Sequence, residues 1–166
     1  MLAEARAHYE ESLGIDRRLH GEKHPSVAIK LMNIAHVLSR QGQHGEALKL
    51  HRKALRIRRR TFGEDHAEVA HTVFIISEAL RGQGKYDEAL EMYEEALGIY
   101  TRALGIDNGE NAKVLLGIAL AKKDSGNRAA ALESASEAVR IYTMRCIINE
   151  RSQGAADLVR ELQGTR

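Results

Sequence analysis

A stretch of 42 residues occurs three times in succession, and this period constrains the fold more than any other feature. The three copies are GEKHPSVAIKLMNIAHVLSRQGQHGEALKLHRKALRIRRRTF (21–62), GEDHAEVAHTVFIISEALRGQGKYDEALEMYEEALGIYTRAL (63–104) and GIDNGENAKVLLGIALAKKDSGNRAAALESASEAVRIYTMRC (105–146). A fixed period between about 20 and 50 residues is typical of proteins whose units bury apolar surface by stacking on one another. The sequence therefore predicts an elongated stack of similar units.

Each copy is predicted to form two helices joined by a glycine turn. In the first copy the first helix begins near Pro25, because the missing N–H of proline costs nothing at a helix start. The helix stops at Gly42, and Gly84 and Gly126 recur at the same repeat position, where we expect the left-handed conformation that often ends a helix. The apolar residues of this helix recur every three or four positions, as on one face of a helix: Val27, Leu31, Ile34, Ala35 and Leu38.

Small residues recur at three positions of the repeat and predict close contacts between helices. One position lies in the first helix and two lie in the second. Small side chains at fixed points let two helix axes approach closely, while larger residues interdigitate around them. The three sets are Ala35, Ser77 and Ala119; Ala47, Ala89 and Ala131; and Ala54, Ala96 and Ala138.

The two ends of the chain are interpreted as partial repeats. Residues 1–20 carry the pattern of a second helix only, so we expect an exposed apolar face that reflects truncation, packs on another element or supports self-association. Residues 147–166 place Ala155, Leu158, Val159 and Leu162 at first-helix spacing, and we interpret them as a capping helix. The chain 1–166 is thus predicted to be one all-α solenoid of about eight helices.

The composition favours no nucleic-acid or membrane partner. Lysine and arginine total 25 against 23 aspartate and glutamate, a formal net charge of +2, which gives no global attraction to phosphate. The sequence has no signal peptide pattern and no stretch that approaches the ~18 apolar residues of a membrane helix. The single cysteine, Cys146, fits a reducing compartment and therefore a cytoplasmic location. Because it shares a repeat position with Phe62 and Leu104, we expect it to be buried.

The repeat positions described above resemble the tetratricopeptide repeat (TPR), with an apolar and then a small residue in helix one, glycine at the turn and two alanines in helix two. The 42-residue period, with GEKHPSVA in the first copy and QGKYDEALEMYEEALGI in the second, is similar to the kinesin light chain type. The resemblance implies a right-handed superhelix of antiparallel helix pairs whose first helices line a concave peptide groove. It also implies that Asn33 contacts the ligand backbone, whereas Ile75 and Gly117 replace asparagine in the other copies.

First-helix residues that point away from both helix contacts are the candidates for this groove. They mix apolar surface with more positive than negative charge, which favours a peptide with acidic and apolar side chains, because arginine can bind a carboxylate bidentately. The alternative is an ordinary solvated helix face. The candidates are Ile29, Met32, Asn33, His36, Arg40, His71, Phe74, Ile75, Glu78, Arg81, Lys113, Leu116, Leu120 and Lys123.

The second helix of the first copy forms a basic patch, Lys49, Arg52, Lys53, Arg56, Arg59 and Arg60. These cations are expected to face the acidic second helix of the next copy, although exposed pairs contribute only ~0–1 kcal/mol each. A site for nucleic acid or another anionic surface is the alternative. It is the less favoured one, because the chain has no interleaved aromatic residues and no nucleic-acid motif.

No metal site, cofactor or catalytic residue is predicted. The eight histidines lack zinc-ligand spacing, and His24 and His66 are interpreted as caps at helix starts. The repeat positions explain Cys146 and Ser77 as packing residues rather than nucleophiles. The sequence as a whole predicts a non-enzymatic protein–protein interaction scaffold that binds a peptide motif or a partner domain.

Overall fold

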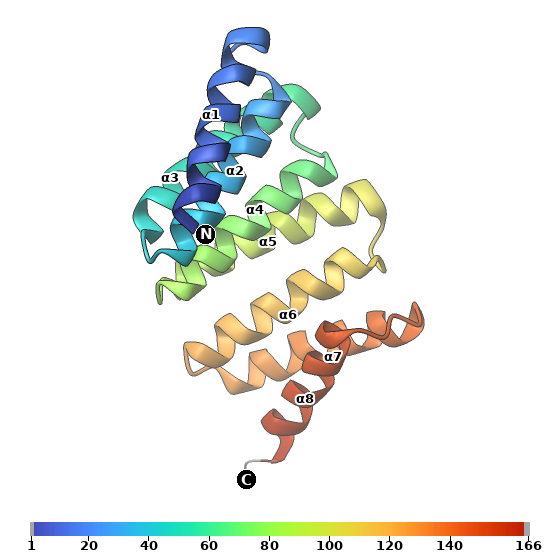
Figure 1. The fold of residues 1–166 in the computed structure, drawn as a ribbon. Coiled ribbons are helices and arrows are strands. Elements are labelled where there is room, and N and C mark those ends of the chain that lie inside the picture. The colour runs from blue at the N-terminus through green and yellow to red at the C-terminus, as the bar shows by residue number, and fades with distance from the viewer. Residues whose placement is uncertain (1, 165–166) are drawn as a thin grey trace.

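The computed structural model describes residues 2–164, which form eight α-helices and no β-strand (Figure 1). The predicted all-α fold is confirmed. None of these helices is both long and apolar enough to span a lipid bilayer. The helices are α1 (Leu2–His20), α2 (Pro25–Arg40), α3 (His44–Phe62), α4 (Ala67–Gly82), α5 (Tyr86–Leu104), α6 (Gly109–Asp124), α7 (Arg128–Met144) and α8 (Glu150–Gly164).

Side-chain caps explain where the first helix of each repeat begins. His24 and His66 each accept, through Nδ1, a hydrogen bond from the backbone N–H two residues later, at 3.3 and 3.1 Å. Asn108 does the same through Oδ1 for the N–H three residues later, at 3.0 Å. Each cap satisfies one of the backbone donors that a helix start leaves free, so the predicted capping role of the two histidines is confirmed.

The turns between paired helices depend on glycine. Gly42, Gly84 and Gly126 have φ angles of 79°, 74° and 88°, a left-handed conformation that other residues rarely adopt. The chain reverses direction at each of these turns, and the two helices on either side of it pack against each other. The three antiparallel pairs are α2–α3, α4–α5 and α6–α7.

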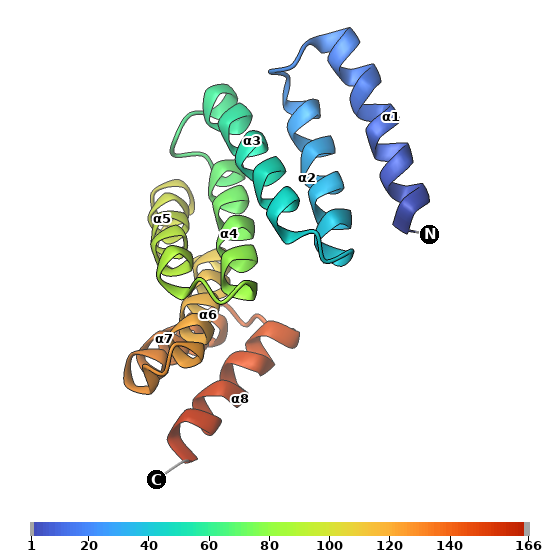
Figure 2. The ribbon, with the colours of Figure 1, turned by 90° about the vertical axis from the view of Figure 1, so that its left-hand side faces the viewer.

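The helix pairs stack into an arc (Figure 2). The first helices α4 and α6 lie on its inner side, and the second helices α5 and α7 lie on its outer side. Helix α1 packs on α2 at one end, while α8 packs on α7 and α6 at the other. The inner face is therefore built mainly from first helices, as the resemblance to tetratricopeptide repeats implies.

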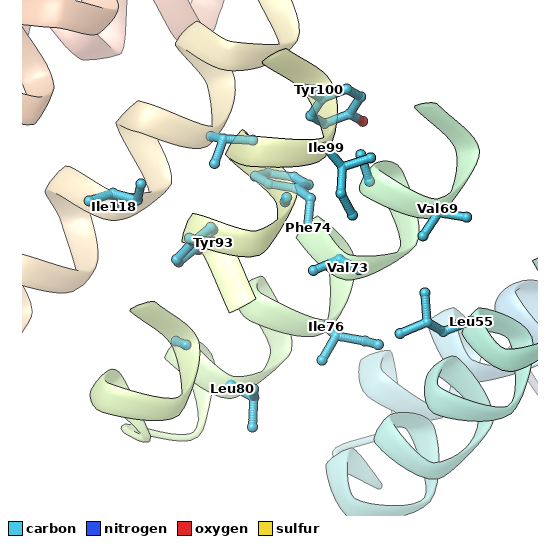
Figure 3. Packing of buried hydrophobic residues seen from close by; sticks show 14 of the residues in the cluster. Leu55, Val69, Val73, Phe74, Ile76, Leu80, Tyr93, Ile99, Tyr100 and Ile118 are labelled. Carbon is cyan, nitrogen blue, oxygen red and sulfur yellow. The ribbon is translucent and has the colours of Figure 1, made fainter. Parts of the chain in front are cut away.

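The small residues at the three repeat positions lie at the helix contacts. All nine, from Ala35 to Ala138, have no exposed surface. Around them one apolar cluster runs from Leu55 of α3, through Phe74 of α4, to Ile118 of α6 (Figure 3). Because this cluster crosses three repeats, burial in one repeat depends on its neighbours.

Cys146 corrects an expectation from the sequence, because its thiol is free and exposed. It follows the last residue of α7 by two positions and has a φ angle of 51°. Phe62 and Leu104, at the same repeat position, are 40% and 49% exposed. This position lies at or beyond the end of the second helix, past the contact with the neighbouring helix. Its side chains are therefore exposed in all three repeats, although the position recurs with the period.

The side chain of Tyr93 fills a space that Gly117 leaves open. Tyr93 lies on α5, is fully buried, and packs with its ring centroid 5.9 Å from that of Phe74. A Cβ atom at Gly117 of α6 would lie 2.5 Å from Cε1 of Tyr93 and 2.8 Å from its Cζ. Glycine at this point of α6 therefore allows a large ring from the preceding repeat to pack against the helix backbone.

We predict that Gly117→Ala destabilises the protein although alanine favours helix. The propensity gain is about 1 kcal/mol, but overpacking against the Tyr93 ring costs about 1–3 kcal/mol, so we expect a net loss of about 1 kcal/mol in urea unfolding. Gly14→Ala in α1 is the matched control, since an added Cβ there has only a distant arginine tip within 4 Å, and it should be stabilising. If both substitutions changed the free energy of unfolding equally, the contact with Tyr93 would not be what restricts residue 117 to glycine.

Candidate functional site

A pocket of about 500 Å³ opens on the inner face between α2 and α4, with α3 behind it. Its apolar lining includes Met32 and Ile75, and its polar lining consists of four histidines together with Asn33, Ser39 and Glu78. No lysine or arginine lines it. The lining residues are Met32, Asn33, His36, Ser39, His44, His51, His71, Ile75, Glu78, Ala79 and Gly82.

The structure brings part of the predicted groove set together in this pocket. Its members from the first two repeats that line the pocket are Met32, Asn33, His36, His71, Ile75 and Glu78. Ile29 and Arg40 lie on the same helix as Asn33 and are exposed outside the pocket, and Phe74 is buried in the core. The candidates of the third repeat lie apart from the pocket, on α6.

Two of these third-repeat candidates pack against the C-terminal helix. Leu116 and Leu120 are half-buried and contact a cluster that contains Leu158 and Leu162 of α8. Lys113 lies with its Nζ atom 4.4 Å from the centre of the Phe74 ring, a cation–π contact. The inner surface of the third repeat is thus partly occupied by the chain itself.

The basic residues of the predicted groove set are mostly paired with carboxylates of the same chain. Arg81 binds Asp124 at 3.1 Å and Glu78 at 3.5 Å. Lys113 binds Glu110, and Lys123 binds Glu161, each at 2.8 Å. Of the four basic candidates only the exposed Arg40 forms no ion pair within residues 2–164. The inner face therefore carries less free positive charge than a residue count indicates.

Tyr93 reaches from α5 to the inner face and donates a hydrogen bond from its hydroxyl to Glu78. Burial, and then the negative charge of Glu78, raise the pKa of Tyr93, so the hydroxyl keeps its proton and remains a donor. Glu78 also binds Arg81. Tyr93 and Arg81 thus both bind Glu78.

The first repeat has two imidazoles where the second has this tyrosine and carboxylate. His51 of α3 stands at the repeat position of Tyr93, and His36 of α2 stands at that of Glu78. His51 is only 4% exposed, and its Nδ1 atom has no hydrogen-bond partner in residues 2–164. Burial, assisted by His36, lowers the pKa of His51 to about 4, so this imidazole is neutral at pH 7.

Four histidines contribute to the pocket, a convergence that sequence reasoning missed. They are His36, His44, His51 and His71, from three helices. Burial, and then the charges of Lys113 and Arg58, lower the pKa of His71. No cluster of three or more histidine, cysteine, aspartate or glutamate side chains in the part of the chain that the structure describes is arranged to hold a metal ion. His51 could have been identified from the sequence, because it stands at the same repeat position as Tyr93.

The predicted basic patch divides into paired and unpaired cations. Lys53 binds Glu22 at 3.3 Å, and Arg59 binds Glu64 at 2.8 Å and also Glu95. A further arginine of the same helix, Arg58, is buried, with ion-pair and hydrogen-bond partners on α4 at 2.6 and 2.8 Å. The remaining members are exposed and form no ion pair within residues 2–164: Lys49, Arg52, Arg56 and Arg60.

We predict that His51 makes the folded state sensitive to acid. The unfolded chain binds a proton at His51 near pH 6.5, but the folded chain does so only near pH 4, so protonation favours unfolding between these values. At pH 5 the loss is about 2 kcal/mol. Urea unfolding at pH 7.5 and pH 5 should therefore show a smaller loss of stability for His51→Leu than for the wild type. Parallel pH dependence of the two proteins would contradict this assignment.

The family follows from comparison with known proteins. The family model described as tetratricopeptide repeat matches residues 26–101 and 73–144, which together make up most of the chain. A search of curated protein sequences finds no match.

Solved structures of other proteins share the fold. BtubC (BKLC) from P. vanneervenii has a TM-score of 0.81 and 22% identity, over 89% of this chain and 59% of that one. The chain thus spans less than two thirds of BtubC. The nearly identical TPR-like repeats of a candidate kinesin light chain from Podosopora anserina have a TM-score of 0.79 and 19% identity, over 99% and 80% of the two chains.

A third structure, the apo form of RapI, has a TM-score of 0.83 and 17% identity, over 99% of this chain and 57% of that one. At these identities the likeness establishes the fold alone. Together with the family match over residues 26–144, it shows that the chain belongs to the tetratricopeptide repeat family and that its 42-residue repeats share the fold of the kinesin light chain-like type.

Proposed function

We propose that this chain is a non-enzymatic interaction scaffold that binds a peptide segment or a partner domain along the inner face of the arc. The observation that carries the proposal is the open pocket of about 500 Å³ between the first helices of two successive repeats. Ligand sites are typically concave and mostly apolar, with a few polar groups that fix orientation. The pocket has this character.

Asn33 gives the proposed groove a means of holding a peptide backbone. Its amide lines the pocket and makes no side-chain hydrogen bond within residues 2–164, so both its donor and its acceptor are available. A peptide bond offers the complementary donor and acceptor. Met32 and Ile75 beside it provide apolar surface for a ligand side chain.

The charges of the groove do not require an acidic ligand. The acidic preference expected from the sequence depended on Arg40, Arg81, Lys113 and Lys123. Carboxylates of the same chain balance the charges of all but Arg40. We therefore propose a ligand defined by apolar and uncharged polar contacts. A cytoplasmic location is part of the proposal, because one free cysteine suits a reducing compartment.

The unpaired cations on α3 support a second candidate function. Lys49, Arg52, Arg56 and Arg60 recur every three or four residues and are exposed, so they form a stripe along α3. Such a stripe would attract nucleic acid or another anionic surface, with affinity that falls steeply as salt increases.

Self-association through α1, where Ile15 and Leu19 are 43% and 70% exposed, remains a separate prediction that sedimentation at increasing concentration would test.

A pair of triple variants tests the groove. Peptides selected from a random display library on the immobilised wild type are labelled, and their Kd is measured by fluorescence polarisation. We expect Asn33→Ala, His36→Ala, Arg40→Ala on α2 to weaken binding at least tenfold, about 1.4 kcal/mol, because these residues lie on the inner face.

The matched control is Lys49→Ala, Arg52→Ala, Arg56→Ala, which changes exposed residues of α3 to the same good helix former. It should leave Kd within twofold of the wild type, and thermal melts should show that both variants fold. Loss of binding in the control alone would favour the second candidate function. Equal binding by all three proteins would refute the groove.

A further inference from the structure

His51, which lines the pocket on the inner face, differs from the residue at the same repeat position in the second repeat. In the second repeat, Tyr93 finds its partner in Glu78, and its ring lies against Gly117. One repeat earlier, the positions of Tyr93, Glu78 and Gly117 hold His51 and His36 of the first repeat and Ile75 of the second. All three line the pocket. The first repeat thus has the same arrangement of positions without the internal hydrogen bond.

His51 is therefore a buried polar group that finds no hydrogen-bond partner among residues 2–164. The residue is only 4% exposed, yet its side chain makes no hydrogen bond within residues 2–164. A neutral imidazole has one donor and one acceptor nitrogen. Leaving such a group unpaired away from water costs free energy, and a ligand that hydrogen-bonds to the part of the ring that lines the pocket offsets this cost.

We propose that this pocket is a subsite for an uncharged carboxamide, the side chain of an asparagine or glutamine in the ligand, recognised by His51 and Asn33. The inference rests on the proposed function, in which the groove holds a peptide. A carboxamide carries N–H donors and a C=O acceptor on one planar group, and neutral imidazole and the Asn33 amide each offer a donor and an acceptor in return.

The charges around the pocket argue against an ionised guest. A ligand carboxylate would find no lysine or arginine among the lining residues. A ligand ammonium would find Glu78 already bound by Tyr93 and Arg81. Because a charge is costly to bury without a partner, the pocket selects a neutral group over either ion.

Small-molecule probes test the subsite without a known partner. Propionamide, propionate, propylammonium and 1-propanol share a short carbon chain and differ in the polar group. They are titrated into isotope-labelled protein while the side-chain resonances of His51 and Asn33 are followed by NMR. We expect propionamide to shift these resonances with an affinity at least tenfold higher than that of the two ions and above that of the alcohol.

Two variants give the controls for the probes. His51→Leu should abolish propionamide binding, because leucine fills the site and offers no hydrogen bond. His8→Leu makes the same change at an exposed histidine of α1 and should leave binding unchanged. Propionate or propylammonium binding as tightly as propionamide would overturn the preference for a neutral group. Equal binding of 1-propanol would overturn the choice of carboxamide.

Peptide selection separates this inference from the proposed function. Peptides selected on the wild type should carry asparagine or glutamine at one position, and replacing that residue by glutamate or methionine should weaken binding at least tenfold. Selection on His51→Leu should lose this preference. If groove-binding peptides show no carboxamide preference on either protein, the subsite is refuted and the groove remains. If propionamide binds at His51 but groove variants leave peptide binding unchanged, the subsite stands and the proposed function fails.

Discussion

The close approach of neighbouring helices at small residues is the contact on which the whole stack depends. At each of the three repeat positions the side chain is alanine or serine and is completely buried, so no atom beyond Cβ, or a single hydroxyl, separates the two helices. Larger residues such as Leu55 and Ile118 then fill the space around these contacts and join the repeats into one apolar cluster. The inner face, and hence the pocket, takes its spacing from these contacts.

Within that frame the repeats differ at the positions that reach the inner face. The second repeat uses a tyrosine and a glutamate, which satisfy each other, while the first uses two histidines, which do not. The packing residues make the repeats alike in shape. The residues of the inner face make each repeat chemically distinct, which is how a solenoid of similar units can offer one specific site.

The fold could be predicted from the sequence because its determinants recur with the period. Gly42 and its equivalents mark the turns, His24 and His66 mark helix starts, and the alanines mark the contacts. The candidate site could be predicted only in part. Asn33 and Ile75 follow from first-helix spacing, but His51 belongs to a second helix, and Arg81 is neutralised by Asp124, 43 residues away. Contacts between repeats decide these details, and periodicity within one repeat does not report them.

The fit of Tyr93 against Gly117 means that the order of the repeats is part of the structure. The ring comes from one repeat and the space for it comes from the next. If residues 63–104 were duplicated in tandem, the first Tyr93 would face a second Ile75 instead of Gly117, and the two side chains would compete for one volume. The three repeats share one pattern of packing residues, but exchanging one for another would break this contact.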